Sequence, residues 1–126
     1  MKQLMSALIL GCGLFAAQAN AACDYPIAPG KFPDGAVATL DEMKTAKASV
    51  VKYNADMDAY LVCINGEYDA KIAADAKITP EKKADLDRVQ AQKQNAAVKE
   101  VTDVTERFNE QLRAYKAKAA AEKKTS

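Results

Sequence analysis

Few side chains in this 126-residue sequence could carry out chemistry, and its cysteines are the first to consider. Cys12, Cys23 and Cys63 are the only three, and there is no histidine. Without histidine, the commonest general base and the usual ligand of catalytic zinc are both missing. Cys23 and Cys63 are 40 residues apart, so they do not form a C-x-x-C redox motif. The cysteines therefore match no catalytic or zinc-binding pattern.

Two pairs of carboxylates are the next candidates for chemistry. Asp56 and Asp58 form one pair, and Asp85 and Asp87 form the other. Residues two apart on a helix point about 160° away from each other, so neither pair can act on one substrate atom. The five glycines form no phosphate-binding or calcium-binding loop. We therefore expect a protein that is not an enzyme, with no cofactor and no metal.

The N-terminal 21 residues predict a secretory signal peptide. Lys2 supplies the positive start, residues 4–17 form an uncharged apolar run, and Ala19-Asn20-Ala21 has the small-x-small pattern of a cleavage site. A membrane-spanning helix is the alternative, but it needs about 20 apolar residues and this run is shorter. We expect cleavage after Ala21, a periplasmic or secreted protein, and no transmembrane segment in the mature chain.

Cleavage would leave Cys23 and Cys63 as the two cysteines of an exported chain, where thiols are oxidised in pairs. The sequence thus predicts one structural disulfide between them. Lipid attachment at Cys12 or Cys23 is the alternative. The apolar stretch before Cys12 is short, and Asn20 stands where a lipid site before Cys23 would have a branched aliphatic residue.

The charges balance overall but are divided along the chain. Without Lys2 the mature chain has 17 basic and 17 acidic residues. Residues 22–80 contain nine acids and six lysines, whereas residues 81–126 contain eight acids and eleven bases. A net charge of zero argues against specific nucleic-acid binding. The opposite signs of the two halves favour packing of one half against the other.

Apolar periodicity predicts a long helix at residues 39–77. Its stripe advances by steps of three and four: Leu40, Met43, Ala46, Val50, Tyr53, Met57, Leu61, Ile64, Tyr68 and Ile72. Thr39 and Glu42 have the residue types of a capping box at its start. Asn65-Gly66 resembles a helix C-cap, so a kink at residues 65–66, or three short helices in place of two long ones, are the alternatives.

A second helix is predicted at residues 80–122, followed by a disordered tail at 123–126. Pro80 suits a first helical turn, and Thr79 can cap it. Its stripe is: Leu86, Val89, Ala97, Val101, Val104, Phe108, Leu112, Tyr115 and Ala119. A reversal at residues 78–79 would pair residues whose numbers add up to about 158. We therefore expect an all-α fold, a long antiparallel hairpin of two helices.

Residues 22–38 read as an extended leader, because Pro26, Pro29 and Pro33 exclude a helix. At about 3.1 Å per residue the leader would reach roughly as far as the helix from residue 39 to 63 is long. It can therefore run back along that helix and bring Cys23 to Cys63. We expect Tyr25, Ile27 and Phe32 to pack on the hairpin. Gly66, one turn beyond Cys63, should relieve crowding where the two backbones converge.

Three short motifs give a resemblance to known proteins. They are the start Cys23-Asp24-Tyr25-Pro26, the step Pro33-Asp34-Gly35 and the helical Tyr60-Leu61-Val62-Cys63. Over about residues 22–68 the chain resembles small, uncharacterised exported proteins of Gram-negative bacteria. The resemblance implies export and the Cys23–Cys63 bond, and it implies no activity.

The basic C-terminal segment is a candidate contact surface. Residues 113–126 carry five bases against Glu122. One interpretation is a contact with an anionic envelope surface through Lys116, Lys118, Lys123 and Lys124. A frayed, soluble helix end is the alternative, since the segment lacks the leucine or aromatic face of a membrane-lying helix.

Two function classes fit these features. The first is an envelope interaction or structural module that binds a protein or a surface polymer, with Tyr53, Tyr60 and Tyr68 either as a ligand platform or, as tyrosines at helical spacing more often are, as part of the core. The second is a small chaperone or inhibitor that holds client segments in an apolar groove containing Met43 and Met57. We expect a monomer rather than a dimer, because the leader would cover the seam of the hairpin.

Overall fold

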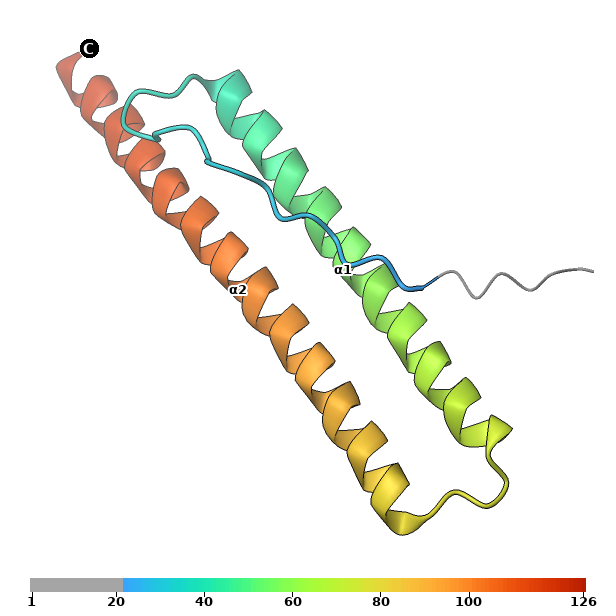
Figure 1. Cartoon of the computed structure of the whole chain (residues 1–126). Helices are drawn as coiled ribbons and strands as arrows, with labels where there is room; N and C mark the ends of the chain where they lie inside the picture. The colour runs from blue at the N-terminus through green and yellow to red at the C-terminus, as the bar shows by residue number, and fades with distance from the viewer. Residues whose placement is uncertain (1–21) are drawn as a thin grey trace, which may run out of the picture.

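The computed structural model describes residues 22–126, which form an antiparallel hairpin of two long helices (Figure 1). Helix α1 spans Leu40–Ala74 and helix α2 spans Pro80–Thr125, and no strand occurs in the described part of the chain. The all-α hairpin is thus confirmed. The predicted signal peptide and the question of lipid attachment at Cys12 concern residues outside the described range.

A capping box begins α1. The Thr39 side chain accepts a hydrogen bond from the Glu42 backbone N–H at 3.2 Å, and the Glu42 carboxylate accepts one from the Thr39 N–H at 2.7 Å. The helix continues through Asn65 and Gly66, so the alternative of three short helices is wrong. It ends at Ala74, three residues earlier than expected, where the Asp75 N–H turns back to the Ile72 carbonyl.

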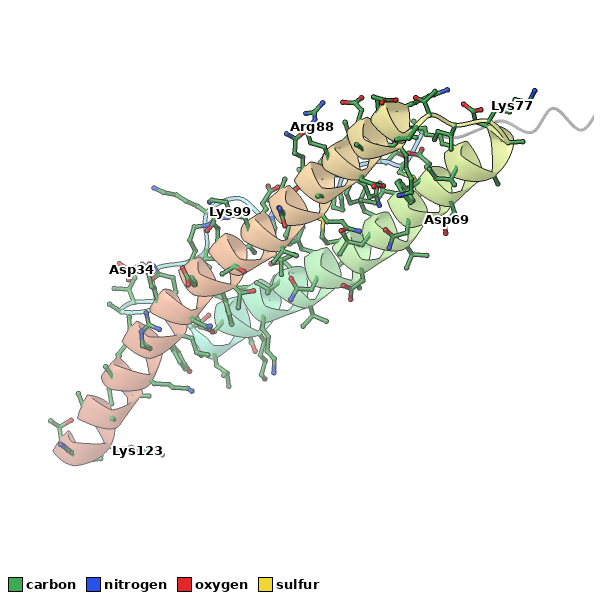
Figure 2. The ribbon with its side chains drawn as sticks, turned by 90° about the horizontal axis from the view of Figure 1, so that it is seen from below. Asp34, Asp69, Lys77, Arg88, Lys99 and Lys123 are labelled. Carbon is green, nitrogen blue, oxygen red and sulfur yellow. A yellow bond between two sulfur atoms is a disulfide. The ribbon has the colours of Figure 1, made fainter. Side chains whose placement is uncertain are left out.

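Helix α2 begins as its sequence predicts and runs further than expected. Thr79 accepts a hydrogen bond from the Lys82 N–H at 3.2 Å, and Pro80 occupies the first turn. The helix extends to Thr125, so residues 123–125, expected in a disordered tail, are helical. Lys123 lies on the end of α2 that projects beyond the start of α1 (Figure 2).

The core is the seam between the two helices, together with one residue from the leader: Ala38, Met43, Ala46, Val50, Tyr53, Met57, Tyr60, Ile64, Ala97, Val104 and Phe108. Contacts across the seam agree with the expected register. Gln94 donates to Asn65 at 2.9 Å, and Lys93 lies 3.9 Å from Glu67. The residue numbers of these two pairs add up to 159 and 160, close to the predicted 158.

The leader runs back along the hairpin in the direction opposite to α1 (Figure 1). The Phe32 ring packs edge-on against Phe108, with centroids 5.6 Å apart, while the Ile27 side chain is 94% exposed. The expectation that Ile27 packs on the hairpin is therefore wrong. The next residue, Ala28, packs against the core instead.

Between residues 22 and 126, neither helix combines the length and apolar character that crossing a membrane requires.

Candidate functional site

The Cys23–Cys63 disulfide joins the start of the leader to the middle of α1. The two Cα atoms lie 5.8 Å apart, and the Cys23 N–H donates to the Glu67 carboxylate at 3.2 Å. The predicted role of Gly66 at this junction is wrong, because a Cβ added to Gly66 would meet no atom within 4 Å. Gly66 is exposed on α1 and leaves the approach of the leader unaffected.

The close approach of two backbones occurs instead at Gly35, at the other end of the leader. A Cβ added there would lie 1.8 Å from the Gln111 carbonyl oxygen and 2.8 Å from the Tyr115 nitrogen. The Gly35 N–H donates to the Gln111 side chain at 2.9 Å. Asp34 closes the turn by accepting from the Ala38 N–H at 2.8 Å. The Pro33-Asp34-Gly35 sequence predicts a turn, but nothing in it predicts that Gly35 contacts α2.

A cluster of tyrosines near Glu100 holds the first part of the leader, next to Cys23. The Tyr25 hydroxyl donates to Glu100 at 2.5 Å, and the Tyr25 ring meets the edge of Tyr60 with centroids 4.9 Å apart. Burial raises the pKa of Tyr25, and the Glu100 carboxylate raises it further. Tyr25 therefore stays protonated at physiological pH and acts as a hydrogen-bond donor. Sequence reasoning placed Tyr25 on the hairpin but did not identify Glu100 as its partner.

Tyr53 lies beneath this cluster in the core. Burial raises the pKa of Tyr53, and the charge of Glu100 adds to the effect. The Tyr53 hydroxyl has no hydrogen-bond partner among residues 22–126. Tyr60 is also buried, whereas Tyr68 is half-buried and donates to Asp87. Two of the three candidate tyrosines are thus core residues and offer no open platform for a ligand.

Arg107 fixes the central part of the leader from α2. Its guanidinium donates to the carbonyl oxygens of Pro29 and Gly30, each at 3.4 Å, and lies 5.6 Å from the centre of the Phe32 ring. Such a contact between a cation and an aromatic face contributes about 0.5–1 kcal/mol at exposed sites. Arg107 thus orients the segment of the leader that faces the start of α1.

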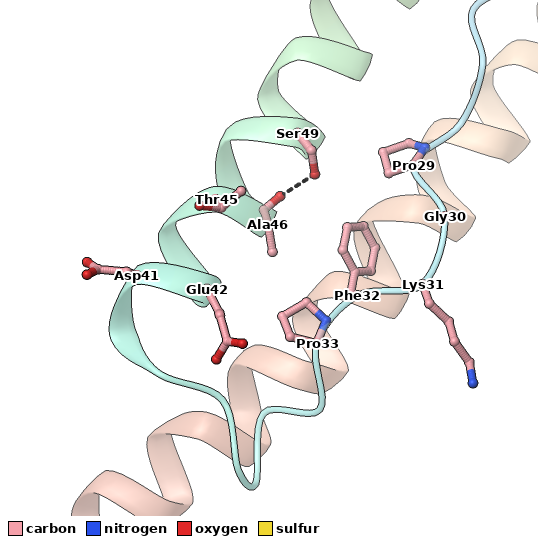
Figure 3. Close-up of a pocket in the computed structure, with 10 residues that line it drawn as sticks. All are labelled: Pro29, Gly30, Lys31, Phe32, Pro33, Asp41, Glu42, Thr45, Ala46 and Ser49. Atoms are coloured by element: carbon pink, nitrogen blue, oxygen red, sulfur yellow. Dashed lines mark hydrogen bonds between the residues drawn. The ribbon is translucent and has the colours of Figure 1, made fainter.

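A groove of about 710 Å³ lies between this segment and the first turns of α1 (Figure 3). Its lining comes from both sides: Pro29, Gly30, Lys31, Phe32 and Pro33 from the leader, and Asp41, Glu42, Thr45, Ala46 and Ser49 from α1. Glu42 points toward Pro33, and Lys31 points away from the groove (Figure 3). Hydrogen bonds from the Thr39 backbone and side chain hold the pKa of Glu42 below its usual value. The groove is therefore a candidate binding surface, with apolar and polar side chains on its walls.

The carboxylate pairs lie on solvated helix faces, next to basic side chains of their own helix. Asp56 contacts Lys52, Asp85 lies 2.5 Å from Arg88, and Asp87 lies 2.8 Å from Lys83. Within residues 22–126, no group of three or more cysteine, aspartate and glutamate side chains is arranged to hold a metal ion.

The four candidate lysines near the C-terminus are placed differently. Lys118 donates to the Ala38 carbonyl at 2.8 Å and lies 5.5 Å from the centre of the Tyr115 ring, so it fastens the end of the leader to α2. Lys116, Lys123 and Lys124 are exposed. Only these three are open to an outside surface.

Comparisons with protein-family models, with curated proteins and with solved structures found no match. The resemblance to small exported proteins stays an expectation. The described residues define the class of the molecule as a helical hairpin with a leader bonded to it by one disulfide.

Proposed function

We propose that this protein is an exported, non-enzymatic binding module of the cell envelope, periplasmic or secreted. It holds an extended segment of another envelope protein in the groove between the leader and α1. The single observation that carries the proposal is the groove itself, which one covalently attached segment and one helix build together.

The lining of the groove supports a protein segment as its ligand. Phe32, Pro29 and Ala46 offer apolar surface to a side chain, whereas Thr45 and Ser49 offer hydroxyl groups. Grooves of this kind bind extended peptides through apolar pockets and a few polar contacts. The carboxylates of Asp41 and Glu42 border one end. The segment therefore carries an aliphatic or aromatic residue next to a lysine or arginine.

The disulfide supports both the proposed cellular compartment and the proposed way in which the groove binds its partner. Such bonds persist in oxidising compartments, which fits the signal peptide predicted at residues 1–21. A leader held before the partner arrives also loses less conformational freedom on binding than a free one would. The Cys23–Cys63 bond thus adds to the preorganisation that Arg107 gives the groove.

The chaperone alternative is less well supported. It requires an open apolar surface that contains Met43 and Met57, and both side chains are buried. A client could reach them only after the leader or α2 had moved away. A surface polymer is the remaining alternative, and the experiment below separates it from a protein segment.

Photo-crosslinking in the envelope tests the proposal. A photoreactive amino acid replaces Thr45, which is exposed in the groove, or Val98 on α2, which is exposed outside it. We expect one discrete crosslinked protein from position 45, none from position 98, and loss of the product with Phe32→Ala. Equal products from both positions would contradict the proposal. A heterogeneous smear would indicate a polymer, and a ladder of many proteins would indicate a chaperone.

A further inference from the structure

The outer face of α1, turned away from α2 and from the leader, carries an 11-residue repeat. Leu40, Val51, Val62 and Ala73 recur at this interval, and the first three side chains are 54%, 58% and 73% exposed. Eleven residues make about three helical turns, so the four positions lie almost on a straight line. We call this face the outer stripe, and all of its residues are exposed: Leu40, Lys44, Ala48, Val51, Ala55, Asp58, Val62, Gly66, Asp69 and Ala73.

The hairpin itself does not account for the small residues of the outer stripe. A Cβ at Gly66 would meet no atom within 4 Å, so nothing inside the molecule requires a glycine there. A glycine in the interior of a helix costs about 1 kcal/mol relative to alanine. Together with Ala48 and Ala55, Gly66 leaves room for the close approach of another helix.

The charges of the outer face indicate the direction of that helix. In the N-terminal half of α1, Lys44 and Lys47 outnumber Asp41, which lies 3.7 Å from Lys44, whereas Asp58 and Asp69 lie in the C-terminal half. Asp69 is on the side of α1 away from α2 (Figure 2). A parallel copy of α1 would place lysine over lysine and aspartate over aspartate. An antiparallel copy places lysine over aspartate at both ends.

We propose that two copies of this chain pair through their outer stripes, with the two α1 helices antiparallel about a twofold axis between residues 56 and 57. In this register Val51 faces Val62 of the second copy, Lys44 faces Asp69, and Leu40 faces Ala73. The paired stretch is about 50 Å long. A twofold interface uses the same patch on both copies and must be self-complementary. The outer stripe meets this condition in its apolar and small residues and in the pairing of Lys44 with Asp69.

The length of the paired stretch selects this register among those that the repeat allows. A shift by 11 residues would bring Val51 against Val51 and Lys44 against Asp58, but it would shorten the paired stretch to residues 40–62, about 35 Å. The two Asp58 side chains come within one turn of each other across the axis, so the dimer is weaker than one with a fully apolar seam. The leader and its groove lie on another face, which the pairing leaves open.

The sequence favours a monomer because the leader covers the seam between the helices, which disfavours pairing through that seam. The outer stripe is a different surface, so the leader does not prevent pairing there.

Sedimentation velocity over a range of concentrations tests the dimer with the oxidised protein. We expect concentration-dependent dimerisation, and Val51→Glu should weaken it by at least tenfold. Val98→Glu is the matched control, because Val98 lies on α2 and is 58% exposed, the same as Val51. A wild-type protein that stays monomeric at all concentrations, or an equal effect of both variants, would overturn the proposal.

Charge reversal tests the direction of pairing. Lys44→Glu turns two attractive contacts of the dimer into two repulsive ones and should weaken association about tenfold. Adding Asp69→Lys to the same chain should restore it. Failure of the double variant to recover would overturn the antiparallel register.

Cysteine crosslinking tests the same register by distance. A mixture of Lys44→Cys and Asp69→Cys chains should form a mixed disulfide dimer under mild oxidation. Lys44→Cys alone should not crosslink, because its two copies would lie about 37 Å apart along the helices. Crosslinking of Lys44→Cys alone as efficiently as the mixture would indicate parallel helices and contradict the proposal.

Discussion

Gly35→Ala should destabilise the contact between the leader and α2 strongly, although it adds only one methyl group. The new Cβ would lie 1.8 Å from the Gln111 carbonyl oxygen, 2.8 Å from the Gln111 carbonyl carbon and 2.8 Å from the Tyr115 nitrogen. Nonbonded carbon contacts are favourable near 3.5–4.0 Å, so the two backbones must separate by about 1.5 Å or more. All three neighbours are backbone atoms and cannot rotate away.

The separation would also break the hydrogen bond from Gly35 to Gln111. Overpacking costs about 1–3 kcal/mol and a lost hydrogen bond about 1 kcal/mol, so we expect a loss of about 3 kcal/mol in the free energy of unfolding. For a domain of this size that loss lowers the melting temperature by roughly 10–15 °C. No glycine in residues 22–126 has a positive φ, so the expected loss comes from the collision alone.

Urea unfolding followed by circular dichroism measures this loss, with Gly66→Ala as the control. A Cβ added at Gly66 would meet no atom of its own chain within 4 Å, so at concentrations where the protein is monomeric alanine there should stabilise it by about 0.5–1 kcal/mol. The two variants make the same chemical change and should shift stability in opposite directions. A Gly35→Ala protein as stable as the wild type would refute the close approach of the leader to α2.

Three further predictions concern single side chains in the leader, in the core and at the start of α1. Tyr25→Phe removes the hydrogen bond to Glu100 and should lower the free energy of unfolding by about 1 kcal/mol in urea unfolding. Tyr53→Phe removes a buried hydroxyl without a partner in residues 22–126, so the same measurement should show no loss or a gain of up to about 1 kcal/mol. The pKa of Glu42 is lowered in the folded state, so its stabilising contribution is complete above its usual pKa of 4.5 and is lost as the pH falls through the lower, folded value. Unfolding measured between about pH 3 and pH 6 should show a smaller acid-dependent loss for Glu42→Gln than for the wild type.

The sequence predicts the hairpin because each helix is encoded locally. The three- and four-residue steps of the apolar stripes, the Thr39 capping box and the Thr79-Pro80 start all act within one or two turns. The register also follows, since the short reversal before Pro80 leaves little freedom in how the stripes meet. The end of α1 was less predictable because helix termination depends on weak preferences of single residues.

The details of the leader could not be predicted in the same way. An extended segment has no helical periodicity, so nothing local distinguished the exposed Ile27 from the packed Ala28. The sequence placed the close approach of two backbones at Gly66 instead of Gly35 for a related reason. Which glycine meets another backbone depends on the path of the leader over α2, and that path is set by contacts far apart in sequence, such as those of Arg107.

The Cys23–Cys63 bond makes the leader a structural part of the hairpin, and thermal unfolding of the Cys23→Ser/Cys63→Ser variant measures its contribution. The bond spans a sequence separation of 40 residues. Closing a loop of that size stabilises the folded state by roughly 4 kcal/mol in the chain-entropy model. Circular dichroism should therefore show a melting temperature roughly 15–20 °C below that of the oxidised protein, with most of the helical signal retained at low temperature. An unchanged melting temperature would mean that the leader is a loose tether and does not stabilise the hairpin.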